Sequence, residues 1–209
     1  MDVHAPHQPV HTWRDFFTHL TIVTIGLFIA LTLEAFVEYL HHRHLVHEAR
    51  ENIRHEIETN HEAAQKDLVL LQRNVDSQVA NIKAIHELMA DPKNFHGSID
   101  NSMNFDSLND AAWRTARDTG ALGFMPYDEV QRYSDLYMLE DLVNKNVIAA
   151  GVQDFDAISS FKMGYDPGSL PADEYVLLLR KNASIQIQFT TLKEFVQQFD
   201  DHCVAELKR

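Results

Sequence analysis

The chain has 209 residues, a formal net charge of -13 at pH 7, and only seven glycines and six prolines. The negative charge excludes a nucleic-acid-binding protein of the usual basic kind, because such proteins need cationic side chains to displace counterions from phosphates. The scarcity of glycine and proline favours long helices over a turn-rich β fold, and the single cysteine, Cys203, excludes an intramolecular disulfide.

Residues 13–40 predict one transmembrane helix. Within them, residues 16–37 contain Glu34 as the only acid, and a helix of that length rises about 33 Å, enough to cross the apolar core of a bilayer. Trp13 and Tyr39 bracket the segment, as aromatic residues do at membrane interfaces. A buried helix or a cleaved signal peptide would share some of these features, but the sequence has no basic region and no small-residue cleavage site. We therefore expect a single-pass membrane protein that contacts the lipid bilayer.

Two rules disagree about the orientation of this helix. Counting positive charges favours a cytoplasmic location for the C-terminal side, because Arg43, Arg50 and Arg54 follow the anchor and only Arg14 precedes it. Residues 1–12 form a short, flexible, proline-containing tail, which is typical of anchors that carry the following domain across the membrane. We expect a bacterial inner-membrane protein with that domain on the periplasmic side.

The anchor carries a stripe of three residues at four-residue spacing, Gly26, Ala30 and Glu34. Small residues at this spacing allow another helix to approach closely, and an acid within an apolar segment is a candidate functional residue. One interpretation is that the stripe packs against a second copy or another membrane protein, with Glu34 hydrogen-bonded across the contact to a group such as Thr32. The other is that Glu34 reaches the headgroups.

Residues 41–209 predict an extramembrane helical bundle, so the fold class is all-α, with the anchor continuing into the long helix of an antiparallel bundle or coiled coil. Residues 41–91 lack glycine and proline, and Pro92 follows Asp91, which ends the helix. A narrow apolar stripe runs along the helix, interrupted at Asn60 and His61, and comprises Val46, Ala49, Ile53, Ile57, Ala64, Leu68, Leu71, Val75, Val79, Ile82, Ile85 and Met89.

The remaining elements are predicted from residues that usually begin or end helices. Residues 92–106 read as a loop by composition. Ser107 and Asp110 resemble a capping box and predict a short helix over 107–119, which Gly120 ends. Two further helices are expected over 126–163 and 171–208, separated by a segment rich in glycine and proline.

The last helix has the most regular heptads in the chain. Its two core positions form a seam that needs a partner surface, either the long helix or a second copy of the chain. Asn182 is the polar member, which either fixes the register or lies at the edge of the bundle and binds water. The seam residues are Leu178, Asn182, Ile185, Phe189, Leu192, Val196 and Phe199.

Twelve of the thirteen histidines lie in the first 96 residues. His44, His47, Glu51 and His55 share helical spacing just beyond the anchor and are candidate ligands for a divalent metal or a group that titrates near neutral pH. The alternative, which we favour, is a solvated collar beside the membrane, because no set of these residues closes a tetrahedral shell.

No sequence motif indicates catalysis. The chain has no nucleophile elbow, no phosphate-binding glycine loop and no zinc-binding His-Glu-x-x-His. The aromatic residues Trp113, Tyr127, Tyr133 and Tyr137 could line a ligand site, but aromatics at helical spacing usually pack in a core. We expect no enzyme activity and no cofactor. The predicted function is a membrane-anchored interaction or accessory protein that self-associates, and the alternative is a sensor-type bundle that responds to a ligand or to pH.

Two segments resemble a family of uncharacterised bacterial single-pass membrane proteins. They are IGLFIALTLEAFVEYLHHRHLVHEAR at 25–50 and AAWRTARDTGALGFMPYDEVQRYSDLY at 111–137. The resemblance implies an N-terminal anchor and a helical domain of unknown function, and it assigns no catalytic residues.

Overall fold

The computed structural model describes residues 12–100, 102–157, 159 and 167–209, and within them it is all-α, with no strand. The chain divides into two compact units, Met1–His47 and Glu48–Arg209, which are considered separately. The helices are α1 at Trp13–Ala90, α2 at Ala111–Asp118, α3 at Tyr127–Ala157 and α5 at Ala172–Leu207. Short 3-10 turns occupy Ala121–Phe124 and Pro167–Ser169.

The first unit is the N-terminal part of α1; its described side chains are exposed as far as His41, and Val46 near its end is buried. Ile22, Phe28 and Leu33 are each more than 60% exposed, which is the reverse of what a soluble helix does with apolar residues. By length and composition this helix is able to cross a membrane. Gly26, Ala30 and Glu34 are all exposed, and the Thr32 hydroxyl donates to Phe28 and Ile29 carbonyls of its own helix.

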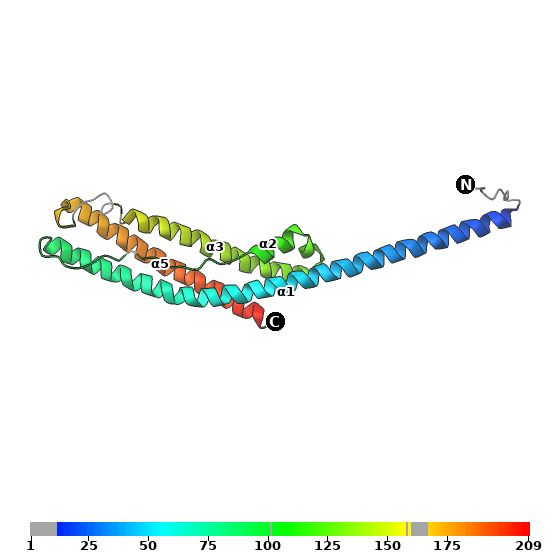
Figure 1. The fold of residues 1–209 in the computed structure, drawn as a ribbon, viewed down its shortest axis with the longest axis horizontal. Helices are drawn as coiled ribbons and strands as arrows, with labels where there is room; N and C mark the ends of the chain where they lie inside the picture. The colour runs from blue at the N-terminus through cyan, green and yellow to red at the C-terminus, as the bar shows by residue number, and fades with distance from the viewer. Residues whose placement is uncertain (1–11, 101, 158, 160–166) are drawn as a thin grey trace, which may run out of the picture. The chain divides into compact units, whose positions relative to one another are not determined.

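The second unit is an antiparallel helical bundle. Helices α3 and α5 pack side by side, and the C-terminal part of α1 runs along them (Figure 1). Side chains join α1 to α5 in antiparallel order: His61 contacts Asp200, and Gln72 accepts a hydrogen bond from Lys193. The structure therefore shows the long N-terminal helix packed against the C-terminal helix of the same chain.

The seam of α5 is buried inside its own chain, so the partner surface that it needs is supplied by α1 and α3. Asn182 is fully buried: its Nδ2 donates to the Leu178 carbonyl at 2.9 Å, and its Oδ1 accepts from Nδ2 of Asn81 at 3.5 Å. Its polar groups are thus satisfied within the bundle, not by water at an edge. The buried seam comprises Leu178, Asn182, Ile185, Phe189, Leu192, Val196 and Phe199, together with Tyr175 and Cys203.

Helix α2 begins at Ala111, four residues later than the start predicted at Ser107. The Ser107 capping box is not used; instead the Glu56 carboxylate accepts hydrogen bonds from the amides of Ala112 and Trp113, at 2.7 and 3.2 Å. A side chain from α1 thus satisfies the free amides at the helix start, which local sequence cannot reveal. Gly120 follows the helix with φ of 79°, the left-handed conformation that glycine adopts readily.

The predicted helices over 126–163 and 171–208 correspond to α3 and α5. The described part of α3 runs from Tyr127 to Ala157, and residues 158 and 160–163 of the predicted range lie outside the described residues. Helix α5 begins after Pro171, whose extended backbone occupies the N-cap position.

Candidate functional site

A row of polar residues lies on the buried face of α1. Asn60, Asp67, Asn74 and Asn81 are spaced by seven residues, and each is at most 7% exposed. They occupy the second core position of a heptad, beside Ala64, Leu71 and Ile85 of the other position. The predicted stripe had placed Leu68, Val75, Val79 and Ile82 in the core, but Val79 is 51% exposed and the other three are half-buried. We call the four buried polar residues the polar ladder.

The ladder holds residues 99, 100 and 102–110, which we call the strap; residue 101 lies outside the described residues. Asn60 donates to the Asn109 carbonyl at 2.7 Å and accepts from the Asn109 amide at 2.8 Å. Asn81 makes the same two bonds to Asp100, at 2.7 and 2.8 Å. Each asparagine side chain thus bonds both the backbone amide and the backbone carbonyl of one strap residue. An extended segment outside a sheet has no neighbouring strand to bond these groups, and the asparagines take that place.

The spacing of these contacts has a simple geometric cause. Seven residues of α-helix rise about 10.5 Å, and three residues of extended chain cover about 10 Å. The strap runs antiparallel to α1, so Asn60, Asp67 and Asn81 meet Asn109, Asp106 and Asp100 in turn. The same register places Asn74 opposite Met103, whose sulfur lies 3.9 Å from the position of an added Cβ at Gly151 of α3.

Two positions of the ladder are incomplete. Asp67 Oδ1 accepts the Asp106 amide at 2.9 Å, but Asp67 Oδ2 is buried without a hydrogen-bond partner. The amide nitrogen of Asn74 is buried and unpartnered as well. Burial is the main cause that raises the pKa of Asp67 to about 6, aided by the charge of Asp106. Buried polar groups without partners are rare in native proteins, so these two mark the weak part of the ladder.

Glu56 forms a second polar centre, one turn before the ladder. Besides the two amides of α2, its carboxylate accepts the Tyr137 hydroxyl at 2.6 Å. The Tyr137 ring stacks on Trp113, with ring centroids 5.2 Å apart. Tyr133 and Tyr137 are therefore part of the core and Trp113 is half-buried at its rim, whereas Tyr127 is 82% exposed. Burial and the bond to Glu56 raise the pKa of Tyr137, so its hydroxyl stays protonated as a donor.

An open cavity of about 330 Å³ lies beside this aromatic pair, between α2 and α3. Glu140 lines it and is 3% exposed, with Oε1 accepting an amide hydrogen of Asn144 at 2.5 Å. Burial is the largest cause that raises the Glu140 pKa to about 7, followed by the charges of Asp110 and Asp141. The cavity also carries Arg114 and Arg117, so it presents both signs of charge and does not select one class of ligand.

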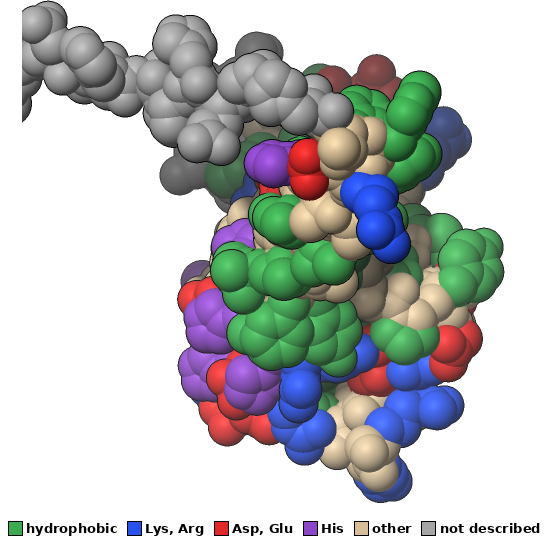
Figure 2. All heavy atoms as spheres, turned by 90° about the vertical axis from the view of Figure 1, so that its right-hand side faces the viewer, with side chains coloured by type: hydrophobic (Ala, Val, Ile, Leu, Met, Phe, Trp, Pro, Cys, Tyr) green, Lys and Arg blue, Asp and Glu red, His purple; other side chains and the backbone are tan. Residues whose placement is uncertain are grey.

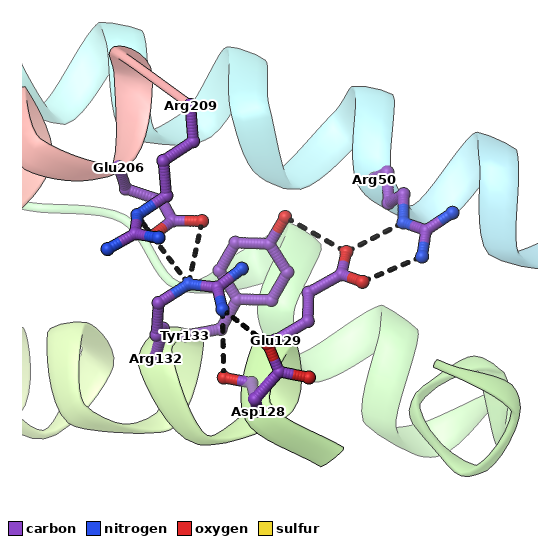
Figure 3. Close-up of polar contacts among 7 residues, drawn as sticks. All are labelled: Arg50, Asp128, Glu129, Arg132, Tyr133, Glu206 and Arg209. Atoms are coloured by element: carbon purple, nitrogen blue, oxygen red, sulfur yellow. Dashed lines mark hydrogen bonds and ion pairs between the residues drawn. The ribbon is translucent and has the colours of Figure 1, made fainter. Parts of the chain in front are cut away.

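Three helices meet in a network of ions near the start of the second unit (Figure 3). Arg50 of α1 donates to both carboxylate oxygens of Glu129 on α3, each at 2.6 Å. Glu129 Oε1 also accepts the Tyr133 hydroxyl at 3.4 Å. Arg132 of α3 contacts Glu206 of α5 at 3.1 Å. The charged residues that line the 280 Å³ hollow among them are four arginines and two glutamates, so positive side chains outnumber negative ones there, and the network joins the helices to one another.

The histidine candidates do not form a metal site in the described residues. His44, His47, Glu51 and His55 are all exposed on α1, and no group of three or more His, Cys, Asp or Glu able to hold a metal occurs in the described part of the chain. Figure 2 shows histidine side chains gathered on one flank of the surface beside acidic side chains. His61, further along α1, contacts the buried Asp200 at 2.6 Å.

The outer face of α3 carries a second heptad pattern that the sequence reasoning did not identify. Large apolar residues there are 64–74% exposed, and an exposed Asp141–Lys145 ion pair at 2.5 Å lies among them. We call this row the α3 stripe; its members, at alternating spacings of three and four, are Met138, Asp141, Lys145, Ile148, Val152 and Phe155. The sequence does contain a signal for the α3 stripe, because its residues repeat at spacings of three and four; the buried residues of α3 show the same spacing, so the two repeats overlap in the sequence.

The one thiol is not an activated nucleophile. Cys203 is fully buried, and burial, with a smaller effect of Asp200, raises its pKa to about 12. A nucleophilic cysteine needs the thiolate, which forms in exposed, electropositive surroundings. Cys203 therefore acts as a small apolar group of the seam.

Comparisons with known proteins leave the site without a family assignment: no protein-family model, curated protein or solved structure matches the chain. The function is therefore inferred from the residues of this chain alone.

Proposed function

We propose that the chain is a non-catalytic, membrane-anchored interaction protein, and that two copies associate through the α3 stripe. The observation that supports this most is the stripe itself. Single exposed apolar residues are common on protein surfaces, but a row of them at heptad spacing is typical of a helix that packs against another helix.

The chemistry of the stripe favours a second copy of the same chain. In a symmetric dimer the same surface faces itself. Asp141 and Lys145 occupy adjacent layers of the stripe, so in a parallel pair each Lys145 can reach Asp141 of the other copy. The apolar residues Ile148, Val152 and Phe155 then cover one another. The α5 seam is not available for this purpose, because it is buried in its own chain.

The anchor contributes by confining both copies to one membrane. We place it in the bacterial inner membrane with the bundle on the periplasmic side, and a reporter enzyme fused to the C-terminus, active on one side only, tests that assignment. Confinement raises the effective concentration of the second copy, so a modest apolar contact suffices for association. The exposed row of Gly26, Ala30 and Glu34 on the anchor offers a second contact of the same kind.

Site-specific photocrosslinking of the full chain in membranes tests the proposal. A photoreactive phenylalanine analogue at Ile148 or Phe155 should yield a crosslinked dimer. The same analogue at Val79, which is also exposed, at 51%, but lies on α1, should not. Replacing Val152 with Asp should abolish the Phe155 crosslink without unfolding the bundle, because Val152 is exposed. Monomer only at both stripe positions, or equal dimer yield at Val79, would contradict self-association through α3.

A second candidate function is a sensor module that responds to protons. The specific observation in its favour is the buried Asp67, with one carboxylate oxygen unpartnered, on the same continuous helix that forms the anchor.

A further inference from the structure

We propose that Asp67 is a proton-binding site and that the bound proton completes the polar ladder by fastening the strap to α1. The inference deepens the second candidate function and does not depend on self-association. It would survive the absence of dimer crosslinks.

Two positions of the ladder, Asn60 and Asn81, have both of their hydrogen bonds to the strap. At Asn60 and Asn81 the side-chain oxygen accepts a backbone amide of the strap, and the side-chain nitrogen donates to the carbonyl of the same residue. Each position therefore needs one acceptor and one donor. Asparagine supplies both in every protonation state.

The Asp67 side chain has the shape of asparagine, but when it is ionised it can only accept hydrogen bonds and cannot supply the donor that the position needs. Its Oδ1 accepts the Asp106 amide, as the asparagines do. Its Oδ2 takes the place of the asparagine nitrogen, and an ionised oxygen there can only accept. That oxygen is buried and has no partner. One proton taken from solvent converts the carboxylate to a carboxylic acid, whose O–H is able to donate to the Asp106 carbonyl as the asparagine amide does.

The charged surroundings support a proton at this position. Burial and the charge of Asp106 oppose ionisation of Asp67, whereas the Asp106 amide bond and Lys66 favour it, and burial is the largest of these effects. On α5 the charged groups on neighbouring turns are Asp200 and Lys193, which bond His61 and Gln72. On α3, Asn144 holds the strap through the Leu108 carbonyl and also bonds Glu140, a second carboxyl whose pKa is raised, to about 7; Lys145 bonds Asp141. The raised pKa, about 6, lies within the range in which a mildly acidic compartment would protonate the group.

The expected consequence is a strap that closes more tightly as the pH falls. Opening the strap exposes Asp67 to water, where its pKa returns to an ordinary value near 4. Protons therefore bind the closed form preferentially, and between pH 7 and pH 5 the ratio of closed to open strap should rise about tenfold. Asn74, the other incomplete position, lies next along the ladder, so the middle of the strap is where opening should begin.

Hydrogen exchange of the strap amides in the full chain, reconstituted in nanodiscs, tests this. After correction for the intrinsic pH dependence of exchange, protection of residues 102–109 in the wild-type chain should rise about tenfold from pH 7 to pH 5. D67N should lose this rise and already be as protected at pH 7 as the wild type is at pH 5. The matched control N81D introduces the same incomplete position elsewhere and should make the pH dependence steeper.

Two results would overturn the proposal. One is a D67N strap that keeps the tenfold rise, which would assign the effect to Glu140 or to the histidines. The other is a D67N strap less protected than the wild type at pH 7, which would mean that the ionised carboxylate is the required form. Infrared difference spectroscopy gives an independent measurement: between pH 7 and pH 5 the wild-type chain should gain a protonated carboxyl band that D67N lacks, whereas the band of Glu140, whose pKa is also raised, should appear in both. Identical spectra for the two chains would also exclude the site.

Discussion

Helix α1 is one continuous helix, but its two parts differ in where their apolar side chains lie and in what their polar side chains bond. In the part up to His41, apolar residues are exposed, and the hydroxyls of Thr18, Thr21 and Thr32 donate to carbonyls of their own helix. In the part from Glu48 onward, the face toward the bundle buries apolar and polar residues together. Hydroxyl bonds within the same helix suit an apolar solvent. The polar residues of the second part bond the strap, α2, α3 and α5.

The largest expected effect comes from Glu56 and would establish how strongly the second part depends on other segments. The two oxygens of Glu56 accept two amides and the Tyr137 hydroxyl. E56Q replaces one of these oxygens with an NH2 donor, which leaves at least one of the three donors unpaired, so we expect a loss of about 3 kcal/mol or more in the free energy of unfolding. Denaturant unfolding followed by Trp113 fluorescence, with Trp13 replaced by Phe throughout, measures it.

The control for that experiment lies in the first part of α1. E34Q changes the same chemical group on an exposed position of the anchor, and we expect the unfolding of the bundle to shift by less than about 0.5 kcal/mol. Equal losses for E56Q and E34Q would show that the two parts of α1 are not independent in the way described.

The next effect compares two positions within the polar ladder. N81L removes two hydrogen bonds to the backbone amide and carbonyl of Asp100 and places an apolar side chain beside the buried Asn182 oxygen, so we expect a loss of about 2 kcal/mol. N74L removes an amide nitrogen that has no partner, so the same substitution should be neutral within about 1 kcal/mol or stabilising. Chemical unfolding of both variants provides the comparison, and a loss for N74L as large as that for N81L would place an unseen partner at Asn74.

The smallest effect concerns the ions that join α1 to α3. A double-mutant cycle of R50A and E129A should give a coupling energy of about 1–2 kcal/mol, because the pair is bidentate and Glu129 is largely buried, although Arg50 is partly exposed. The exposed pair Lys83–Glu87 within α1 should give no more than about 0.5 kcal/mol. A coupling energy for Arg50–Glu129 no greater than that for Lys83–Glu87 would mean that the network in Figure 3 is no stronger than an exposed ion pair.

The sequence predicted the class of the fold well, and its errors in the core have one source. Apolar periodicity identified α1, and Ile53, Ile57 and Leu71 are buried as expected. It misplaced Val79 because it counted only apolar residues, whereas the second core row of α1 is polar. The repeat of Asn60, Asp67, Asn74 and Asn81 was visible in the sequence, but polar residues at a fixed period usually indicate a solvated face.

The sequence by itself thus determined an all-α chain with one exposed apolar helix and a regular seam on α5, because helical periodicity is a local property of side chains. Only the tertiary structure decided where the polar groups of α1 go. The partners of the ladder are backbone amides and carbonyls between 19 and 49 residues away, and every residue type carries these groups. Side-chain patterns therefore could not show that the strap lies along α1, or that Asp67 stands at a position where the other three residues are asparagines.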